Sequence, residues 1–132
     1  GGAARYRGRA GERALRTRSC AALEEAVLLT TSPLLMNEDE RRDFRRVESR
    51  VRLSRYGGDC YAYCMLAAGH VDLVIECGLK PHDVVPLIPI IAGAGGVITT
   101  WDGEPAHKGG RIVAAGDARL HGTALAALAE RE

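Results

Sequence analysis

The sequence lacks an excess of charge of either sign. Its 18 lysines and arginines nearly balance its 17 aspartates and glutamates, which leaves a formal net charge of +1. A charge this small gives no overall field to attract nucleic acid or a membrane surface. The sequence also lacks any apolar run near the roughly 20 residues of a membrane-spanning helix. We therefore expect a soluble protein that binds neither nucleic acid nor membranes.

Cysteines are few and widely spaced. The four of them, Cys20, Cys60, Cys64 and Cys77, lack the dense spacing of a disulfide scaffold, and the first residues show no apolar signal peptide. These absences predict a reducing, cytoplasmic setting. A zinc site made from cysteines and His70 fits the usual ligand spacing poorly, and apolar neighbours place Cys60 and Cys64 in or near the core.

The length of 132 residues, with 46% hydrophobic content, predicts a single α/β domain over residues 1–132. The sequence opens with glycine in the middle of a hairpin pattern, so we expect a fragment of a longer chain. Six arginines fall within the first 18 residues. They are typical of the solvent-facing side of a hairpin, although a phosphate-binding patch is the alternative.

Apolar runs alternate with amphipathic segments along the rest of the chain. We expect strands at residues 26–31, 51–54, 72–76, 97–99 and 112–114. We expect helices at residues 39–50, 59–68 and 83–94 and from residue 117 to the end. Such alternation predicts a mixed, mostly parallel sheet flanked by helices.

Two helices carry more specific signals. Asn37 and Glu40 form a capping pair, which predicts a first long helix with Phe44 inward. In the helix expected over residues 83–94, Pro86 lies in the first turn at no cost, whereas Pro89 should bend the helix or loosen its start.

Three polar residues follow strands and are candidates for ligand binding: Arg55, Asp59 and Asp83. Both aspartates are expected at helix starts, so one edge of the sheet would present them to a ligand. Aspartate is equally a common helix cap, and a purely structural role stays open for each. The amides of the turn at Gly58 precede a helix and could meet a polar or anionic ligand. His82 is expected on the surface, with a general base as the alternative.

Four motifs together resemble the inositol monophosphatase superfamily, and within it the histidinol-phosphatase branch. They are Arg-Tyr-Gly-Gly-Asp-Cys-Tyr-Ala-Tyr at residues 55–63, the run at 69–76, Leu-Lys-Pro-His-Asp at 79–83 and Gly-Ala-Gly-Gly at 93–96. The likeness extends over nearly the whole chain. It implies the carboxyl-terminal half of a layered αβαβα sandwich, which would form a homodimer at full length.

The resemblance also implies an activity. Members of this branch are Mg²⁺-dependent phosphomonoesterases of histidine biosynthesis that convert histidinol phosphate, a small phosphate ester, to histidinol and phosphate. Asp83 matches the last metal-binding aspartate of the family. Arg55 and Asp59 match positions that hold the non-phosphate part of the substrate. An acid there suits a substrate that carries an ammonium and an imidazole.

The sequence departs from the family pattern in two ways. The family's other metal ligands, an upstream glutamate and an Asp-Pro-x-Asp-Gly-Thr motif, do not occur in it, so we expect activity only when the missing amino-terminal half is supplied. Ala92 replaces a usual glutamate, which should affect packing rather than chemistry. The alternatives are a phosphatase for inositol phosphate or another sugar phosphate, and a non-catalytic binding fragment.

Overall fold

The computed structural model describes the backbone of residues 5–8 and 11–130, and side chains from residue 15 on. Strands β1 (Arg5–Gly8) and β2 (Gly11–Ala14) form the expected antiparallel hairpin. The prediction that arginine side chains of this hairpin face solvent lies outside the described residues.

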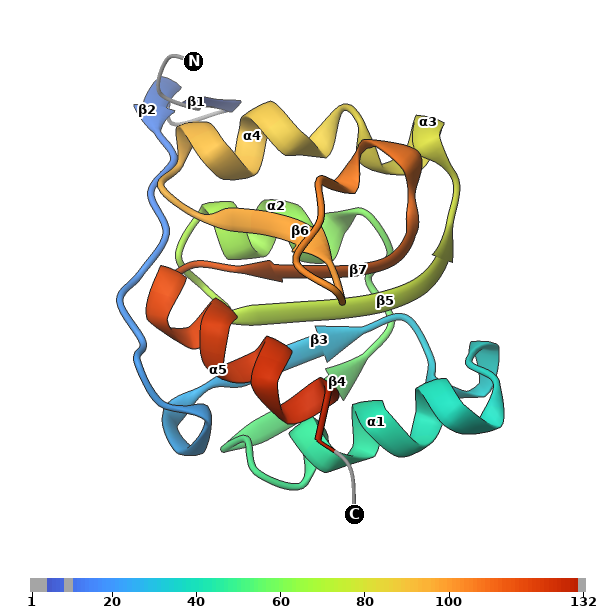
Figure 1. The fold of residues 1–132 in the computed structure, drawn as a ribbon. Coiled ribbons are helices and arrows are strands. Elements are labelled where there is room, and N and C mark those ends of the chain that lie inside the picture. The colour runs from blue at the N-terminus through green and yellow to red at the C-terminus, as the bar shows by residue number, and fades with distance from the viewer. Residues whose placement is uncertain (1–4, 9–10, 131–132) are drawn as a thin grey trace.

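A five-stranded sheet forms the centre of the fold (Figure 1). Its order is β4 (Leu53–Tyr56), β3 (Val27–Thr30), β5 (Leu73–Leu79), β7 (Gly110–Ala115) and β6 (Val97–Thr100). Strand β3 pairs in parallel with β4 and β5, whereas β7 is antiparallel to both β5 and β6. Four of the five strands therefore point the same way, which confirms the predicted mixed, mostly parallel sheet.

Helices cover both faces of this sheet. In Figure 1, α1 (Glu38–Glu48) and α5 (Ala118–Leu128) lie on one side, and α2 (Tyr61–Ala67) and α4 (Leu87–Gly93) lie on the other. The four-residue helix α3 (Pro81–Val84) leads from β5 into α4. Short 3-10 turns occupy Leu23–Glu25, Pro33–Leu35 and Ala106–Lys108.

The inner strands β3, β5 and β7 are buried on both faces because their apolar side chains alternate between two cores. Leu73 and Ile75 of β5 pack in the core with α1 and α5, whereas Val74 packs in the core with α2 and α4. All three are 0% exposed. A strand that is covered on both faces has a continuous apolar sequence, and this pattern predicted β5.

Helix α1 follows its sequence signals closely. The Asn37 side chain accepts a hydrogen bond from the Glu40 N–H at 2.8 Å, and the Glu40 carboxylate accepts one from the Asn37 N–H at 2.9 Å. This reciprocal pair satisfies two amides that a helix start leaves unpaired. Phe44 is 0% exposed, which confirms its inward direction.

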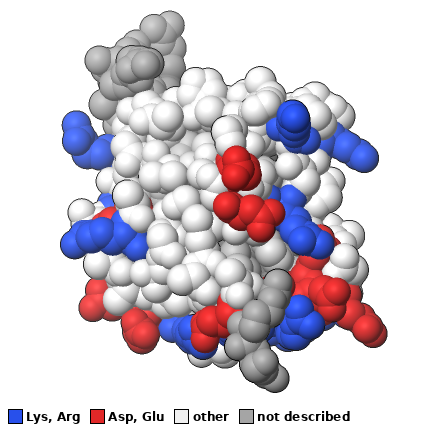
Figure 2. Space-filling model, viewed as in Figure 1, with Lys and Arg blue, Asp and Glu red and all other residues white. Residues whose placement is uncertain are grey.

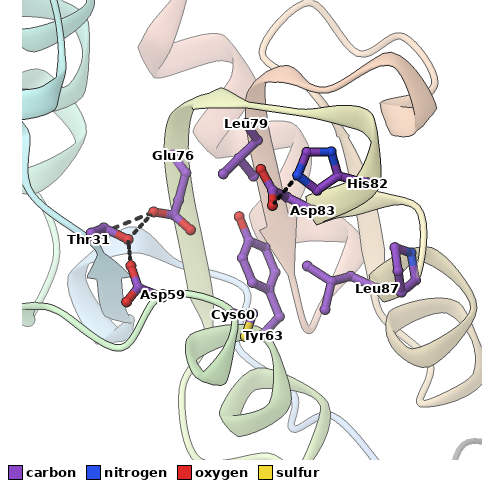
Figure 3. Close-up of a pocket in the computed structure, with 10 residues that line it drawn as sticks. Thr31, Asp59, Cys60, Tyr63, Glu76, Leu79, His82, Asp83 and Leu87 are labelled. Atoms are coloured by element: carbon purple, nitrogen blue, oxygen red, sulfur yellow. Dashed lines mark hydrogen bonds and ion pairs between the residues drawn. The ribbon is translucent and has the colours of Figure 1, made fainter.

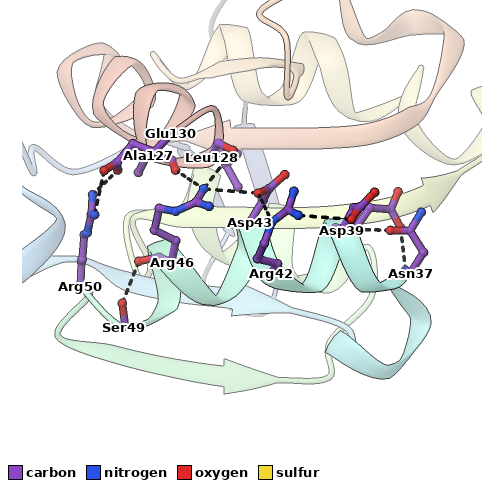
Figure 4. A network of polar contacts seen from close by, with 11 residues as sticks. Asn37, Asp39, Arg42, Asp43, Arg46, Ser49, Arg50, Ala127, Leu128 and Glu130 are labelled. Carbon is purple, nitrogen blue, oxygen red and sulfur yellow. Dashed lines mark hydrogen bonds and ion pairs between the residues drawn. The ribbon is translucent and has the colours of Figure 1, made fainter. Parts of the chain in front are cut away.

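Arginines of α1 and of the turn after it bind the end of α5 (Figure 4). The Arg46 guanidinium donates to the carbonyl oxygens of Ala127, at 2.9 Å, and Leu128, at 3.3 Å. Arg50 pairs through two nitrogens with the Glu130 carboxylate. A positive group at unpaired carbonyls of a helix carboxyl end is favourable, so these contacts join two helices that are distant in sequence.

The single helix predicted over residues 83–94 is wrong, because the structure divides it into α3 and α4. The break falls at Val85 and Pro86, and Pro86 is the residue before the first turn of α4. Pro89 is the third residue of α4, where a backbone N–H would have no partner within the helix. Both prolines therefore lie where they cost no helical hydrogen bond, and Ala92 is exposed on α4.

The surface carries charge of both signs. Basic and acidic side chains mix on the face shown in Figure 2, in keeping with the net charge of +1. The most exposed large apolar side chains are Leu34 and Leu35, in the turn after β3. In the part of the chain that the structure describes, no helix combines the length and apolar character needed to cross a membrane.

Candidate functional site

A pocket of about 530 Å³ lies where strands β3 and β5 end (Figure 3). Parallel strands of an α/β sheet commonly present ligand-binding residues at their carboxyl ends. Ten residues line the pocket: Thr31, Asp59, Cys60, Tyr63, Glu76, Leu79, His82, Asp83, Pro86 and Leu87. Three carboxyl groups thus reach one cavity: Asp59 from the segment after β4, Glu76 from β5 and Asp83 from α3.

Asp83 lies in this pocket and at a helix start as predicted, but as the third helical residue rather than as the N-cap. Helix α3 already begins at Pro81, whose fixed backbone angle suits a first helical position, so Asp83 is the third residue. One carboxylate oxygen accepts the Lys80 N–H at 2.9 Å, and the other lies 3.4 Å from the ring Nε2 of His82. The Asp83 side chain remains 45% exposed, and that of His82 is on the surface as expected.

Asp59 also lines the pocket, and its predicted role as the first residue of a helix is wrong. Helix α2 begins two residues later with Cys60 as its cap. Asp59 instead has a left-handed backbone with φ 45°, and the two glycines before it share that region with φ 95° and 97°. Its carboxylate lies 3.2 Å from the hydroxyl of Thr31, which brings it to the pocket wall.

Glu76 is a site residue that the sequence motifs did not single out, as are Thr31 and Tyr63. It lies on β5, is only 5% exposed, and accepts hydrogen bonds from both the N–H and the hydroxyl of Thr31. Burial raises the pKa of the Glu76 carboxyl, and the two bonds from Thr31 offset part of that rise. The available signal was an acidic residue directly after the apolar run of a buried strand.

The Thr31 hydroxyl stands between two carboxyl groups (Figure 3). It lies 2.5 Å from a Glu76 oxygen and 3.2 Å from an Asp59 oxygen. A hydroxyl has one hydrogen to donate, so only one of these carboxylates can receive it. The contact between the Thr31 oxygen and the second carboxylate becomes favourable when a proton or a cationic group binds between them. This wall of the pocket is therefore built to attract positive charge.

The remaining predicted site residues lie apart from the cavity. Arg55 is exposed on the edge strand β4, and neither it nor Gly58 lines the pocket. Asp59 and Asp83 are the two predicted residues that the structure brings together. Cys60 lines the pocket and is exposed, as is Cys64, so their predicted burial is wrong.

Asp83 cannot form a magnesium site with the residues around it. Magnesium requires close to six oxygen ligands in octahedral geometry. Among the side chains that the structure describes, from residue 15 to residue 130, no three histidines, cysteines, aspartates or glutamates come together as metal ligands. One oxygen of Asp83 is also engaged by Lys80. The described residues alone therefore do not fit the ion.

Comparison with known proteins gives consistent matches. Residues 2–132 match the model of the inositol monophosphatase family. The Arabidopsis thaliana protein "Bifunctional phosphatase IMPL2, chloroplastic" is 47% identical over 121 residues, 85% of this chain and 35% of that protein. A histidinol-phosphatase of Streptomyces coelicolor is 36% identical over 67% of this chain and 33% of its own length.

Solved structures share the fold. An inositol monophosphatase from Zymomonas mobilis superposes with a TM-score of 0.84 at 44% identity, covering 87% of this chain and 46% of that one. The extragenic suppressor protein suhB from Bartonella henselae gives 0.81 at 25% identity, over 91% of this chain and 47% of its own. The chain thus spans about a third of these curated relatives and about half of these structures.

Proposed function

Because the chain belongs to the inositol monophosphatase family, we propose that it is the carboxyl-terminal part of a phosphatase acting on small phosphate monoesters. The proposed substrate is histidinol phosphate, hydrolysed to histidinol and phosphate in histidine biosynthesis. The observation that carries this choice is the pair of carboxyl groups, Asp59 and Glu76, on either side of the Thr31 hydroxyl. Histidinol phosphate carries an ammonium and an imidazole that such a pair binds, whereas an inositol phosphate does not.

A second candidate is a phosphatase for inositol phosphate. It is supported by the likeness to the inositol monophosphatase from Zymomonas mobilis, which is 44% identical to this chain. Hydroxyl groups of a polyol also donate hydrogen bonds to carboxylates, but they bring no positive charge to the wall at Thr31.

The family is generally dependent on Mg²⁺. We propose that Asp83 supplies one oxygen ligand to such an ion and that the missing amino-terminal half supplies the others. Arg55 and Gly58 stay predictions as substrate contacts, as do the homodimer of the full-length protein and its cytoplasmic location.

Substrate profiling of the full-length protein tests the proposed function. We expect a higher kcat/KM for histidinol phosphate than for inositol 1-phosphate in the presence of Mg²⁺. Equal or better turnover of inositol 1-phosphate would favour the second candidate. If this chain forms a stable complex with its amino-terminal half and neither ester is hydrolysed, the chain is a binding fragment instead.

Replacing Asp83 with asparagine tests the metal role. Asparagine keeps an acceptor for the Lys80 N–H but loses the charge, so we expect helix α3 to persist while Mg²⁺ affinity falls. The loss should be at least the roughly 10- to 100-fold that removal of outer-shell partners of metal ligands costs. Asp102→Asn, in an exposed turn away from the pocket, is the matched control. Unchanged Mg²⁺ affinity and turnover in Asp83→Asn would remove Asp83 from the metal site.

A further inference from the structure

The hydroxyl of Tyr63 is buried without a hydrogen-bond partner. Tyr63 lies on α2 and is 1% exposed, and its hydroxyl is the one buried side-chain oxygen or nitrogen among the described residues that lacks a partner. Buried tyrosine hydroxyls usually find a partner, because leaving one unpaired costs free energy. Such an exception therefore points to a state of the protein in which the hydroxyl is used.

The surroundings of this hydroxyl indicate which group it serves. The Tyr63 ring lines the pocket, and Figure 3 shows its hydroxyl directed toward the side of the pocket that carries Glu76 and Asp83. Burial, followed by the charge of Glu76 and by its carboxyl as a hydrogen-bond acceptor within reach, raises the pKa of Tyr63 well above its usual value, so the hydroxyl keeps its proton at neutral pH. The hydroxyl is therefore a hydrogen-bond donor. Glu76 is close enough for its charge to affect the pKa of Tyr63.

One oxygen of the Glu76 carboxylate can accept a hydrogen bond from this donor. Both hydrogen bonds from Thr31 reach the same oxygen, Oε2. Within the described part of the chain, no hydrogen bond reaches the second oxygen, Oε1. A protonated hydroxyl without a hydrogen bond of good geometry thus stands within reach of the Glu76 carboxylate, in the wall of the proposed substrate pocket.

We propose that Tyr63 is a positioning residue that acts through Glu76. When a cationic ligand group occupies the pocket, the Tyr63 hydroxyl donates to Oε1 of Glu76 and holds that carboxylate ionised and facing the ligand. Tyr63 thereby gives the pocket a preference for phosphate esters of ammonium- or imidazolium-bearing alcohols over those of neutral polyols. This inference rests on the proposed function and names the residue that sets its specificity.

The test compares Tyr63→Phe with Tyr61→Phe in the full-length protein. Tyr61 lies two residues earlier on the same helix, is 65% exposed and does not line the pocket. For Tyr63→Phe we expect KM for histidinol phosphate to rise roughly 10- to 100-fold, the change that corresponds to losing a hydrogen bond to a charged group. The kcat for this ester and both constants for inositol 1-phosphate should stay nearly unchanged. Tyr61→Phe should change none of them.

Two further measurements separate positioning from structure. Thermal unfolding of Tyr63→Phe should be unchanged or shifted upward, because the substitution removes an unpaired buried hydroxyl. In a Glu76→Gln background, Tyr63→Phe should have no further effect on KM, because the residue acts through that carboxylate. An equal loss for both esters, or an additive effect in the double variant, would overturn the proposal. So would a Glu76→Gln variant that keeps the preference, whether or not Tyr63→Phe folds.

Failure of the proposed function gives a different result. If the wild-type protein hydrolyses neither ester, calorimetric titration with histidinol and with inositol still measures the pocket's preference. Tyr63→Phe should then weaken the binding of histidinol alone. Wild-type protein that binds neither compound, or binds both equally, would overturn the inference about Tyr63 as well.

Discussion

Replacing Thr31 with valine removes one hydroxyl and leaves a side chain of nearly the same shape. In the folded protein that hydroxyl supports the charged form of Glu76. Burial raises the pKa of Glu76, so at pH values between its ordinary and its raised pKa the folded protein keeps a proton that the unfolded chain has released. The free energy of unfolding therefore falls as the pH rises through this window. Thr31→Val raises the pKa of Glu76 further, and the fall becomes larger.

The expected magnitude follows from the loss of one hydrogen bond to a charged group. At a pH well above the raised pKa of Glu76, where the carboxyl is ionised, Thr31→Val should lower the free energy of unfolding by about 1.5–3 kcal/mol. At about pH 4, where the carboxyl is protonated, the lost bond is neutral and the difference should be about 1 kcal/mol or less. Urea unfolding followed by the fluorescence of the single, buried tryptophan, Trp101, measures both values.

A matched control uses the same substitution at the surface. Thr123 is exposed on α5, and its hydroxyl donates to the neutral Arg119 carbonyl at 3.0 Å. Thr123→Val should therefore have a small effect that does not depend on pH. If Thr31→Val costs the same at both pH values, the Thr31 hydroxyl does not support an ionised Glu76, and the reasoning about this wall of the pocket is refuted.

Two substitutions test how the fold holds the site. Asp72 is 1% exposed and accepts two hydrogen bonds from the half-buried Arg18 guanidinium, at 2.7 and 2.8 Å. Asp72→Asn should therefore lower the free energy of unfolding in urea by about 2–3 kcal/mol. A decrease well below 1 kcal/mol would contradict this. Gly109 has φ 75°, and a Cβ there would lie 2.3 Å from the Leu79 carbonyl oxygen, so Gly109→Ala should cost about 2 kcal/mol or more. Gly110→Ala, with φ 89° in open space, should cost less, and equal losses would show that the contact with Leu79 is unimportant.

Elements with local signals were predicted well. The capping pair Asn37 and Glu40 and the inward Phe44 lie within eight residues of one another, so their interactions form wherever the segment is placed. The inner strands β3, β5 and β7 were predicted because strands covered on both faces require continuous apolar runs. Pro81 also carries a local signal, because proline favours the first position of a helix and α3 begins there.

The candidate site depended on contacts that the sequence does not reveal. Thr31 and Glu76 are 45 residues apart and meet because β3 and β5 are neighbours in the sheet. The left-handed backbone of Asp59 belongs to a turn that brings its carboxylate to the same hydroxyl, so its identity alone suggested a helix cap. Asp83 was placed in a crevice correctly, because the end of a buried strand is visible in the sequence.

The order of the sheet affects how the chain can fold during synthesis. Strand β7 lies between β5 and β6, yet it is made after both of them. Until residues 110–115 leave the ribosome, β5 has an open edge and β6 has no neighbour in the sheet. Unpaired edges of this kind recruit other strands, so the nascent chain depends on β7 arriving before another molecule does. The nascent chain is thus exposed to aggregation for as long as β7 has not yet been made.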